Sequence, residues 1–264
     1  MSVARIAYEA CPLCGDAAII DLAEVDCRAH PAWQPELPAV IEWCQCHVCG
    51  HVFTGGYFGA DGLAAIFRTT LEHQRPGFDV EGQRLAWSRV VERVTATLPA
   101  VAGAWLDVGF GNGSLLFTAQ EWGYETHGID LRSDAVAQLK GFGVNAELAT
   151  LADLSGEKRF RVISLADVLE HMPYPNEALA AAARLIEDDG RLFISSPNRE
   201  TAVWKALDQV GANPYWGELE HFHNFSRSGM VGLLEKHGFA PMTYAVSDRY
   251  RSGMDIVARK SQGR

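Results

Sequence analysis

Cysteine is absent from this 264-residue sequence after position 49, although six cysteines lie within residues 11–49. Residues 1–15 also lack the apolar stretch of an export signal, so disulfide bonds are not expected. Thiols that cluster this tightly without an export signal indicate a metal site instead.

Two further shortages restrict the partners of the chain. No segment approaches the roughly 20 apolar residues that a membrane-spanning helix requires, so we expect a cytoplasmic protein without a membrane partner. Basic residues are scarce: the formal net charge is −10, and residues 1–56 contain only Arg5 and Arg28 against seven acidic residues. Because nucleic-acid binding normally rests on Lys and Arg that neutralise phosphates, we expect no nucleic-acid partner.

The composition is otherwise that of a globular chain. A hydrophobic content of 48% with 21% charged residues allows a buried core. The length suits one α/β domain with a small accessory module. We predict a small module over 1–56, a linker with a lid helix over 57–84, and the main α/β domain over 85–264.

The stretches CPLCG at 11–15 and CHVCG at 46–50 are two copies of Cys-x-x-Cys-Gly. A tight turn between paired cysteines directs two thiolates at one centre, and the glycine supplies the backbone freedom for that turn. Two such knuckles predict a tetrahedral four-sulfur site, for which zinc is the usual occupant. Four protein ligands leave no open position, so this zinc is predicted to be structural. The predicted ligands are Cys11, Cys14, Cys46 and Cys49.

The other thiols and imidazoles of this region are spare ligands, namely Cys27, Cys44, His47 and His51. An irregular turn would let one of them replace a predicted ligand. We expect Cys27 and Cys44 to be small buried apolar residues instead.

The stretch AWLDVGFGNGSLL at 104–116 predicts a strand, a turn and the start of a helix. Trp105 to Val108 is expected to be the buried strand, and the helix is expected over 114–122. Glycine in the turn lets the backbone approach a ligand at the carboxyl end of a strand. By itself this pattern is weak, because a plain strand-to-helix turn also fits it. The turn glycines are Gly109, Gly111 and Gly113.

The surroundings of the turn narrow the choice of ligand. A second strand ends at Asp130, where a carboxylate can accept hydrogen bonds from both ribose hydroxyls. The Gly-Lys-Ser/Thr of a phosphate-binding loop is absent, and Ser114 stands where a dinucleotide fingerprint has its third glycine. Asp107 before the turn would repel a pyrophosphate, whereas it suits a cationic, amine-bearing ligand.

With these features the chain resembles the class I S-adenosylmethionine-dependent methyltransferases. LDVGFGNGSLL and GIDLR are similar to the first and second motifs of that family. FRVISLADVLEHMPYPNEAL (160–179) and GRLFISSPN (190–198) are similar to its fourth and fifth strands. The resemblance covers roughly residues 80 to 260. It implies a Rossmann-like, doubly wound seven-stranded sheet and makes 85–264 the methyltransferase domain.

The resemblance also implies S-adenosylmethionine as the cofactor. Asp107 would face the methionyl amine and Asp130 would take the ribose hydroxyls. Thr150 departs from the family pattern, which often has an acidic residue there. The other implied contacts are Gly109, Gly111 and Gly113 for the methionine and ribose, Leu131, Thr150 and Leu151 for the adenine, and Ala166 and Asp167 near the sulfonium.

Hydrophobic periodicity predicts helices that alternate with the strands. Ser226 is the predicted N-cap of the last helix, and Gly238 is its predicted stop. Residues 241–248 and 253–260 are predicted to form a closing hairpin. The predicted helices cover 80–98, 114–122, 133–141, 175–187 and 227–237.

The segment GELEHFHNFS at 217–226 places two carboxylates and two imidazoles close together. It lies between the fifth strand and the last helix, on the side where doubly wound sheets bind ligands. In an extended segment His221 and His223 share one face while Glu218 and Glu220 share the other, so one metal does not easily collect all four. A histidine titrates near neutral pH and can remove the proton of an acceptor hydroxyl.

EHFHNFS also resembles the Glu-His-x-x-x-Phe-Ser segment of zinc-knuckle methyltransferases that act on nucleotide sugars and surface polysaccharides. This resemblance implies that Glu220 and His221 lie at the acceptor, with His221 as the leading general base. The implied acceptor is a hydroxyl of a sugar, a nucleotide sugar or another small molecule. The alternative is a structural His221; we expect His223 to be structural and Glu218 to be a solvated loop carboxylate.

Two other functions stay open at this point. A ribosomal-RNA methyltransferase with a zinc module is disfavoured by the acidic N-terminal segment and by the absence of an Asn/Asp-Pro-Pro-Tyr/Phe motif. No cysteine after Cys49 is present to serve as the nucleophile of pyrimidine C5 methylation. A non-catalytic, cofactor-binding scaffold is disfavoured by the intact glycine turn with Asp107 and Asp130.

Overall fold

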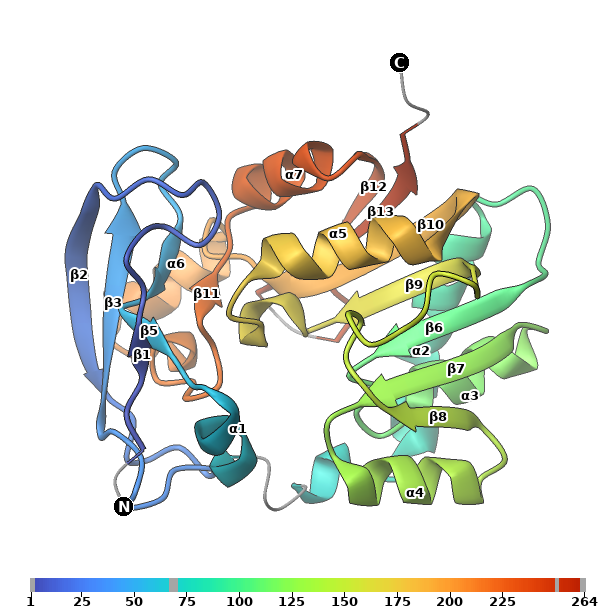
Figure 1. The fold of residues 1–264 in the computed structure, drawn as a ribbon, viewed down its shortest axis with the longest axis horizontal. Coiled ribbons are helices and arrows are strands. Elements are labelled where there is room, and N and C mark those ends of the chain that lie inside the picture. Colours follow the sequence, from blue (N-terminus) through green and yellow to red (C-terminus); the bar gives the residue numbers. More distant parts are fainter. Residues whose placement is uncertain (1–2, 67–70, 250–251, 262–264) are drawn as a thin grey trace.

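The computed structural model describes residues 3–66, 71–249 and 252–261. A seven-stranded sheet with helices on both faces lies beside a four-stranded sheet made mainly from N-terminal residues (Figure 1). Two short strands, β1 (Ile6–Ala7) and β5 (Gly56–Tyr57), form a third, small sheet. None of the helices within the described ranges combines the length and the apolar character that a bilayer crossing requires.

The larger sheet has the strand order β12–β13–β10–β9–β6–β7–β8. Strands β6 to β10 run parallel, and β13 is antiparallel to both β10 and β12. This confirms the predicted Rossmann-like, seven-stranded sheet with its closing hairpin. The strand order reverses between β6 and β9, which is where open α/β sheets bind ligands. The strands are β6 (Ala104–Val108), β7 (Glu125–Asp130), β8 (Asn145–Leu148), β9 (Phe160–Ala166), β10 (Ile186–Pro197), β12 (Phe239–Val246) and β13 (Gly253–Lys260).

All the predicted helices are present, and their ends follow local chemistry. Ser226 caps the last helix as predicted, because its Oγ accepts a hydrogen bond from Gly229 N at 2.9 Å. Gly238 follows that helix with a φ of 77°. The helix predicted over 175–187 ends earlier, since Ile186 is already extended and begins β10. These helices are α2 (Val80–Thr95), α3 (Ser114–Glu121), α4 (Ser133–Gly141), α5 (Pro175–Leu185) and α7 (Arg227–Lys236).

The remaining helical elements are short. The predicted linker over 57–84 contains α1 (Ala60–Ile66) and the 3₁₀ turn η1 (Glu72–Gln74), while residues 67–70 of that linker lie outside the described ranges. Helix α6 (Ala202–Gln209) and the turn η3 (Pro214–Trp216) precede the segment 217–226. The turn η2 (Leu169–His171) follows β9.

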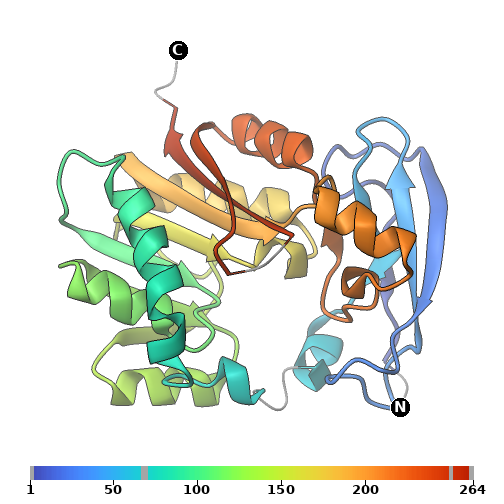
Figure 2. The same cartoon turned by 180° about the vertical axis from the view of Figure 1, so that it is seen from behind.

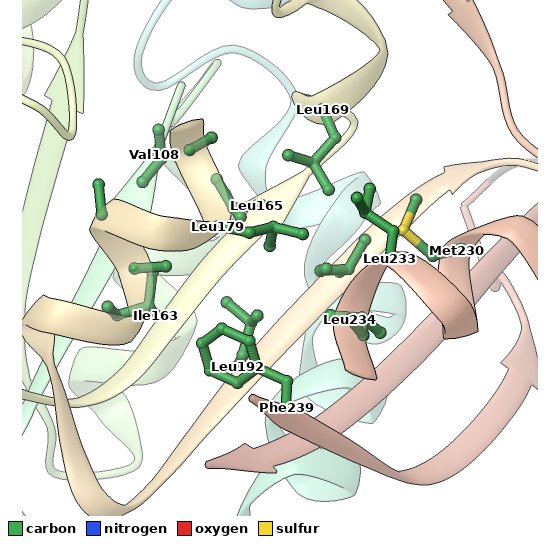
Figure 3. Packing of buried hydrophobic residues seen from close by; sticks show 14 of the residues in the cluster. Val108, Ile163, Leu165, Leu169, Leu179, Leu192, Met230, Leu233, Leu234 and Phe239 are labelled. Carbon is green, nitrogen blue, oxygen red and sulfur yellow. The ribbon is translucent and has the colours of Figure 1, made fainter. Parts of the chain in front are cut away.

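Different helices cover the two faces of the larger sheet (Figures 1 and 2). Leu179 of α5 and Leu234 of α7 pack with Leu192 on one face (Figure 3). Helices α2 and α3 cover the other face. Trp105 and Leu106 of β6 belong to opposite cores, which explains why this strand is buried at every position.

The smaller sheet is antiparallel, with the order β11–β4–β3–β2. Strand β11 comes from the segment 217–226 and places His223 opposite Phe53 of β4. The smaller sheet thus combines three strands of the predicted module 1–56 with one strand of the predicted domain 85–264, and β11 is its edge strand on the side of the larger sheet (Figure 1). The three domain boundaries remain predictions. The strands are β2 (Ile19–Asp26), β3 (Val40–Cys46), β4 (Val52–Thr54) and β11 (His223–Asn224).

Candidate active site

A cavity of about 840 Å³ lies at the carboxyl ends of β6, β7 and β9, next to α2. This is the point where the strand order reverses, the usual ligand position in open α/β sheets. Of the residues predicted to contact the cofactor, Gly113 does not line the cavity. Those that do are Asp107, Gly109, Gly111, Asp130, Leu131, Thr150, Leu151, Ala166 and Asp167.

The glycine turn leaves open space at its centre. A Cβ at Gly111 (φ 54°) would meet no described atom within 4 Å, whereas a Cβ at Gly109 (φ 63°) would meet Val168 Cγ2 at 3.1 Å. Gly113 (φ 78°) precedes α3, and a Cβ there would lie 2.9 Å from Leu139 Cδ1 of α4. Gly111 therefore offers bare main chain to a ligand, whereas Gly113 permits close packing beside α4.

Asp107 of β6 is buried, with 3% of its surface exposed. The Ser164 hydroxyl donates to its Oδ1 at 2.5 Å, and the Trp105 indole donates to that hydroxyl at 2.9 Å. Burial raises the pKa of Asp107 to about 7, and the hydrogen bond from Ser164 and the charge of Arg249 offset this only in part. This carboxyl group therefore changes charge near neutral pH, and a cationic ligand would favour its ionised form.

Asp130 at the end of β7 is held by Arg132. The guanidinium donates from Nε to Oδ1 at 2.8 Å and from Nη2 to Oδ2 at 2.6 Å, and the Arg132 amide donates to Oδ1 at 2.9 Å. Both side chains are buried, and Gln74 of η1 accepts a further bond from Arg132 Nη1 at 3.1 Å. Leu131 between them lines the cavity and is 52% exposed, so a flat ring can pack against it.

Asp167 follows β9 with a φ of 57°, which is uncommon for a residue other than glycine. Its amide donates to Ser195 O at 2.9 Å, and its carboxylate forms an ion pair with Arg249. The Arg249 guanidinium also lies 4.0 Å from the ring centroid of Trp87 in α2. All three of these side chains line the cavity, so the ion pair ties the end of β9 to the segment between β12 and β13.

Thr150 and Leu151 follow β8. The Thr150 hydroxyl and amide both donate to Asp153 Oδ2, at 2.7 and 2.8 Å. The hydroxyl is thus engaged in its own turn, which restricts it as a donor to a ligand. Contacts of Thr150 and Leu151 with the cofactor remain predictions.

The segment 217–226 meets the cavity at Glu220. His171 of η2 also lines it, and His171 Nδ1 lies 3.1 Å from Glu220 O and 3.8 Å from Glu220 Oε2. His221 contacts His171 edge to face, with ring centroids 4.6 Å apart. Burial, together with the His171 imidazole, holds the pKa of His221 well below its usual range, so this imidazole is neutral at pH 7.

The backbone of this segment departs from the extended geometry considered above. Residues 218–221 form a turn rather than an extended strand, since His221 N donates to Glu218 O at 3.2 Å. Glu218 is a loop carboxylate whose side chain is 34% exposed, and its Oε2 also lies 3.0 Å from Nε2 of His30 in the N-terminal module. The turn breaks the alternation of side chains, so the predicted sharing of faces does not hold.

The four predicted metal ligands converge in the structure. Cys11 Sγ lies 3.6 Å from Cys49 Sγ, and Cys14 Sγ lies 3.5 Å from Cys46 Sγ. All four sulfur atoms lie within 4.8 Å of one another. Zinc–sulfur bonds of about 2.3 Å in a tetrahedron separate the sulfurs by about 3.8 Å, so this donor set fits zinc.

The spare ligands have other roles or positions. Cys27 and Cys44 are buried outside the four-cysteine cluster, as expected. His51 Nε2 lies 3.0 Å from His223 Nδ1, and His223 Nε2 lies 2.8 Å from Met172 O. His223 is therefore structural, as expected. Its contact also engages Nε2 of His51, one of the spare ligands.

Residues 78–244 match the family model of a methyltransferase domain. The chain belongs to this family. Among curated proteins, it is 34% identical over 130 residues to the ubiquinone biosynthesis O-methyltransferase of Xanthomonas oryzae pv. oryzae (strain PXO99A), covering 46% of this chain and 54% of the relative. It is 26% identical over 170 residues to the protein of the same name from Serratia proteamaculans (strain 568), covering 57% and 70%. The chain thus spans about half the length of the first of these relatives.

Solved structures share the methyltransferase fold. The 1,6-didemethyltoxoflavin-N1-methyltransferase of Burkholderia thailandensis superposes with a TM-score of 0.59 at 20% identity, over 80% of this chain and 96% of that one. The magnesium protoporphyrin IX methyltransferase of Synechocystis PCC 6803 superposes with a TM-score of 0.55 at 19% identity, over 78% and 97%. Identities this low show a common fold alone.

Several residues in and around the cavity escape prediction from sequence. Arg132 has a local signal, since a basic residue two positions after a buried Asp130 can pair with it. Ser164 lies opposite Asp107 in the register of β9 with β6, and only knowledge of that register could find it. Arg249 follows β12 and has no comparable signal.

Proposed function

We propose that the protein transfers a methyl group from S-adenosylmethionine to a hydroxyl group of a small molecule. The observation that carries this proposal is a single cavity at the switch point that Asp107, Gly111, Asp130, His171 and Glu220 line together. The two solved relatives support the cofactor, because both were determined with S-adenosylhomocysteine bound. The names of the curated relatives support an oxygen acceptor.

The side chains present fit this cofactor. Asp107 offers a carboxylate to the methionyl ammonium, and the bare main chain at Gly111 admits a ligand. A carboxylate has about four acceptor sites, and Arg132 occupies three of those of Asp130, which leaves room for a ribose hydroxyl. When bound, the cofactor supplies an electrophilic methyl group. The further proposed contacts are Gly109, Gly113, Leu131, Thr150, Leu151, Ala166 and Asp167.

Methyl transfer to a hydroxyl requires an aligned acceptor and a group that removes its proton. We assign the alignment to Glu220, which lines the cavity, and the proton removal to His221, which contacts the cavity-lining His171 but is not itself a lining residue. The neutral imidazole is the form that accepts a proton, and burial keeps His221 in that form. The same burial disfavours the imidazolium product, so the base needs a compensating negative charge nearby.

Within the hydroxyl acceptors we propose a sugar or nucleotide sugar, on the resemblance of EHFHNFS to the acceptor segment of zinc-knuckle methyltransferases. The curated relatives, which are named for ubiquinone biosynthesis, make a ubiquinone precursor the competing acceptor. Both classes of acceptor would present a hydroxyl to the same base. A methyl-transfer assay that offers both classes shows which of the two is methylated.

We also propose that Cys11, Cys14, Cys46 and Cys49 hold a structural zinc. The support is the spacing of the four sulfurs and the equivalent backbone of the two turns. Gly15 N donates to Cys11 O at 2.8 Å, and Gly50 N donates to Cys46 O at 2.9 Å. Four thiolates leave no open coordination position, so this metal takes no part in methyl transfer.

Titration calorimetry with S-adenosylhomocysteine tests the cofactor half of the proposal. We expect binding by the wild type, and a loss of about tenfold or more in affinity for Asp107→Asn and Asp130→Asn, because each removes a charge-assisted hydrogen bond. Asp188→Asn, whose side chain is 96% exposed, is the matched control. Absence of binding by the wild type would overturn the proposal.

The same titration has a pH dependence that belongs to Asp107. Because its pKa is about 7, the ionised fraction rises between pH 6 and pH 8, and affinity for the ammonium-bearing ligand should rise by up to about tenfold. Asp107→Asn should lack this rise. An equal pH response in both proteins would show that another group is responsible.

Transfer of labelled methyl groups into sugars, nucleotide sugars and ubiquinone precursors tests the acceptor half. His221→Gln should slow turnover by about a hundredfold or more, which is typical for loss of a general base, and leave S-adenosylhomocysteine affinity within about twofold. His127→Gln, in β7 outside the cavity lining, is the control. Unchanged turnover in His221→Gln would show that His221 is structural.

A further inference from the structure

Glu170 is a buried acid that the proposed mechanism does not use. Its side chain has no exposed surface, and neither carboxyl oxygen has a hydrogen-bond partner of normal geometry within the described residues. Burial raises the pKa of Glu170 to about 8, and its own amide and the Ser196 hydroxyl counteract this only in part. Burying a polar group without a partner costs free energy, so its position requires an explanation.

The neighbours of Glu170 are the two imidazoles of the acceptor side. One oxygen of Glu170 and one nitrogen each of His171 and His221 lie within 4.8 Å of one another. His171 Nδ1 already has a partner in Glu220 O, whereas His221 Nδ1 is buried and unpartnered among the described residues. Phe222 N also donates to Glu170 O at 2.7 Å, which fixes η2 against the turn that carries His221. Glu170 and His221 are thus adjacent groups that each lack what the other can supply.

We propose that Glu170 is a positioning residue whose carboxylate accepts the Nδ1–H of His221. A proton on Nδ1 leaves Nε2 unprotonated, which is the form that can take the proton of a hydroxyl. The Glu170 oxygens and His221 Nδ1 are unpartnered within the described part of the chain, although one nitrogen of His221 lies within 4.8 Å of a Glu170 oxygen. Catalytic hydrogen bonds of this kind often close only when substrate binds. The catalytic consequence rests on the proposed function, whereas the pairing itself does not.

A negative charge on Glu170 would also compensate the burial of His221, which otherwise weakens this imidazole as a base. When the acceptor oxygen bonds to the methyl carbon, the carbon–sulfur bond breaks and its electron pair stays on a neutral thioether. The hydroxyl proton moves to His221 Nε2, and the imidazolium that forms carries its other proton toward the Glu170 carboxylate. A carboxylate at that position stabilises the positive charge, in the way the third member of a catalytic triad does.

The other charged groups around the pair come from several elements. His171 of η2, His30 of the N-terminal module and His223 of β11 disfavour a positive charge on His221. Glu220 and Glu218 of the turn act on His171 in the opposite sense. Within this set Glu170 is the group with a pKa of about 8, so the ionised pair forms as pH rises through that value. Below it, a protonated Glu170 donates to Nδ1 and leaves the imidazole proton on Nε2.

Long-range ¹H–¹⁵N NMR spectra of the full chain labelled with ¹⁵N-histidine report the tautomer directly, without cofactor or acceptor. The signals lost in His221→Gln identify His221. In the wild type we expect the Nε2–H form at pH 6.5 and the Nδ1–H form at pH 9. In the isosteric Glu170→Gln variant this pH response should disappear, whereas Glu170→Asp, which keeps a titrating carboxyl, should retain it at a shifted pH. The His223 signals are an internal control, since both of its nitrogens have fixed partners.

Three outcomes would overturn the proposal. These are a His221 tautomer that does not change with pH in the wild type, a change that persists in Glu170→Gln, and selective broadening of the His221 signals by Mn²⁺. The last would show that the three groups hold a cation instead. Because the spectra need no methyl transfer, a failure of the proposed function would appear separately, as absent cofactor binding or turnover.

Discussion

Two carboxylates of the cavity, Asp107 and Asp130, are each held by one neighbouring residue. Ser164 donates to Asp107, and Arg132 clamps Asp130. A buried carboxylate costs free energy unless such donors compensate the water that it loses. The donors therefore set both the orientation and the charge that a ligand meets, although sequence patterns draw attention to the acids alone.

The Arg132–Asp130 pair gives a measurable prediction. Arg132→Met should lower the free energy of unfolding by about 3–5 kcal/mol, because it removes the guanidinium and leaves the buried Asp130 carboxylate with only the backbone amide of residue 132 as a donor. Adding Asp130→Asn should recover much of that loss, since the remaining side chain is then neutral. Urea unfolding of the four proteins of this cycle measures the coupling.

The control for this cycle is a pair of the same chemistry at the surface. Arg28 and Asp26 form an ion pair with side chains that are 64% and 48% exposed, so Arg28→Met should leave the free energy of unfolding almost unchanged. If Arg132→Met cost no more than Arg28→Met, the buried pair would have no structural role.

Elements formed by contacts close in sequence were predictable, and those formed by distant contacts were not. Helix α7 follows from its apolar periodicity, with Ser226 and Gly238 as local end signals. Strand β11 has two residues, and its partner β4 lies far away in the sequence, so no local pattern indicates it. No local pattern indicates the turn over residues 218–221 either.

The residues of the candidate site likewise divide into those that local sequence patterns indicate and those that depend on distant contacts. Asp107 and Asp130 stand at the ends of predicted strands, and parallel strands bring such ends to one edge of the sheet. The link between Ser164 and Asp107 requires the register of β6 with β9, which a hydrophobic pattern does not specify. Glu170 sits in a turn whose neighbours come from residues 217–226, so its relation to His221 depends on the tertiary fold.

His223, which lies where β11 pairs with β4, should make the protein less stable in acid. Burial lowers the pKa of His223 to about 4, so between pH 6.5 and 4 the unfolded chain binds a proton that the folded chain does not. Stability should therefore fall as pH falls, by about 2 kcal/mol between pH 7.5 and 5 from this group. Urea unfolding at the two pH values measures the loss.

His223→Gln should reduce that pH response. At pH 7.5 the variant should itself be less stable by about 1–3 kcal/mol, because His51 or the Met172 carbonyl loses a buried partner. An unchanged response in His223→Gln would assign the acid sensitivity to other buried imidazoles.

On the scale of the whole molecule, the two cysteine turns dock on the methyltransferase domain through their backbone carbonyls. Asn176 of α5 donates to Pro12 O at 2.7 Å, and Lys236 of α7 donates to Leu13 O at 2.8 Å. Arg199 donates to Gly50 O at 2.7 Å. These hydrogen bonds form only when both cysteine turns have their native backbone geometry. The proposed zinc would hold that geometry, so it would also fix the position of the smaller sheet against the larger one (Figure 1).

Removal of the proposed zinc should therefore separate acceptor chemistry from cofactor binding. We expect about one zinc per purified chain by mass spectrometry and none in Cys46→Ser, because structural zinc in small modules contributes folding free energy directly. S-adenosylhomocysteine affinity should stay within about twofold, since the cofactor residues belong to the larger sheet. Methyl transfer should fall, because β11 anchors the turn of Glu220 and His221 to the smaller sheet.

The matched control for this experiment is Cys27→Ser. Cys27 is as buried as Cys46 but lies outside the cluster, where its Sγ donates to Pro38 O at 3.3 Å, so this variant should keep its zinc and its turnover. Full turnover in a zinc-free Cys46→Ser protein would show that the acceptor turn is held by the larger sheet alone. Loss of cofactor binding in that variant would show instead that the two sheets fold as one cooperative unit.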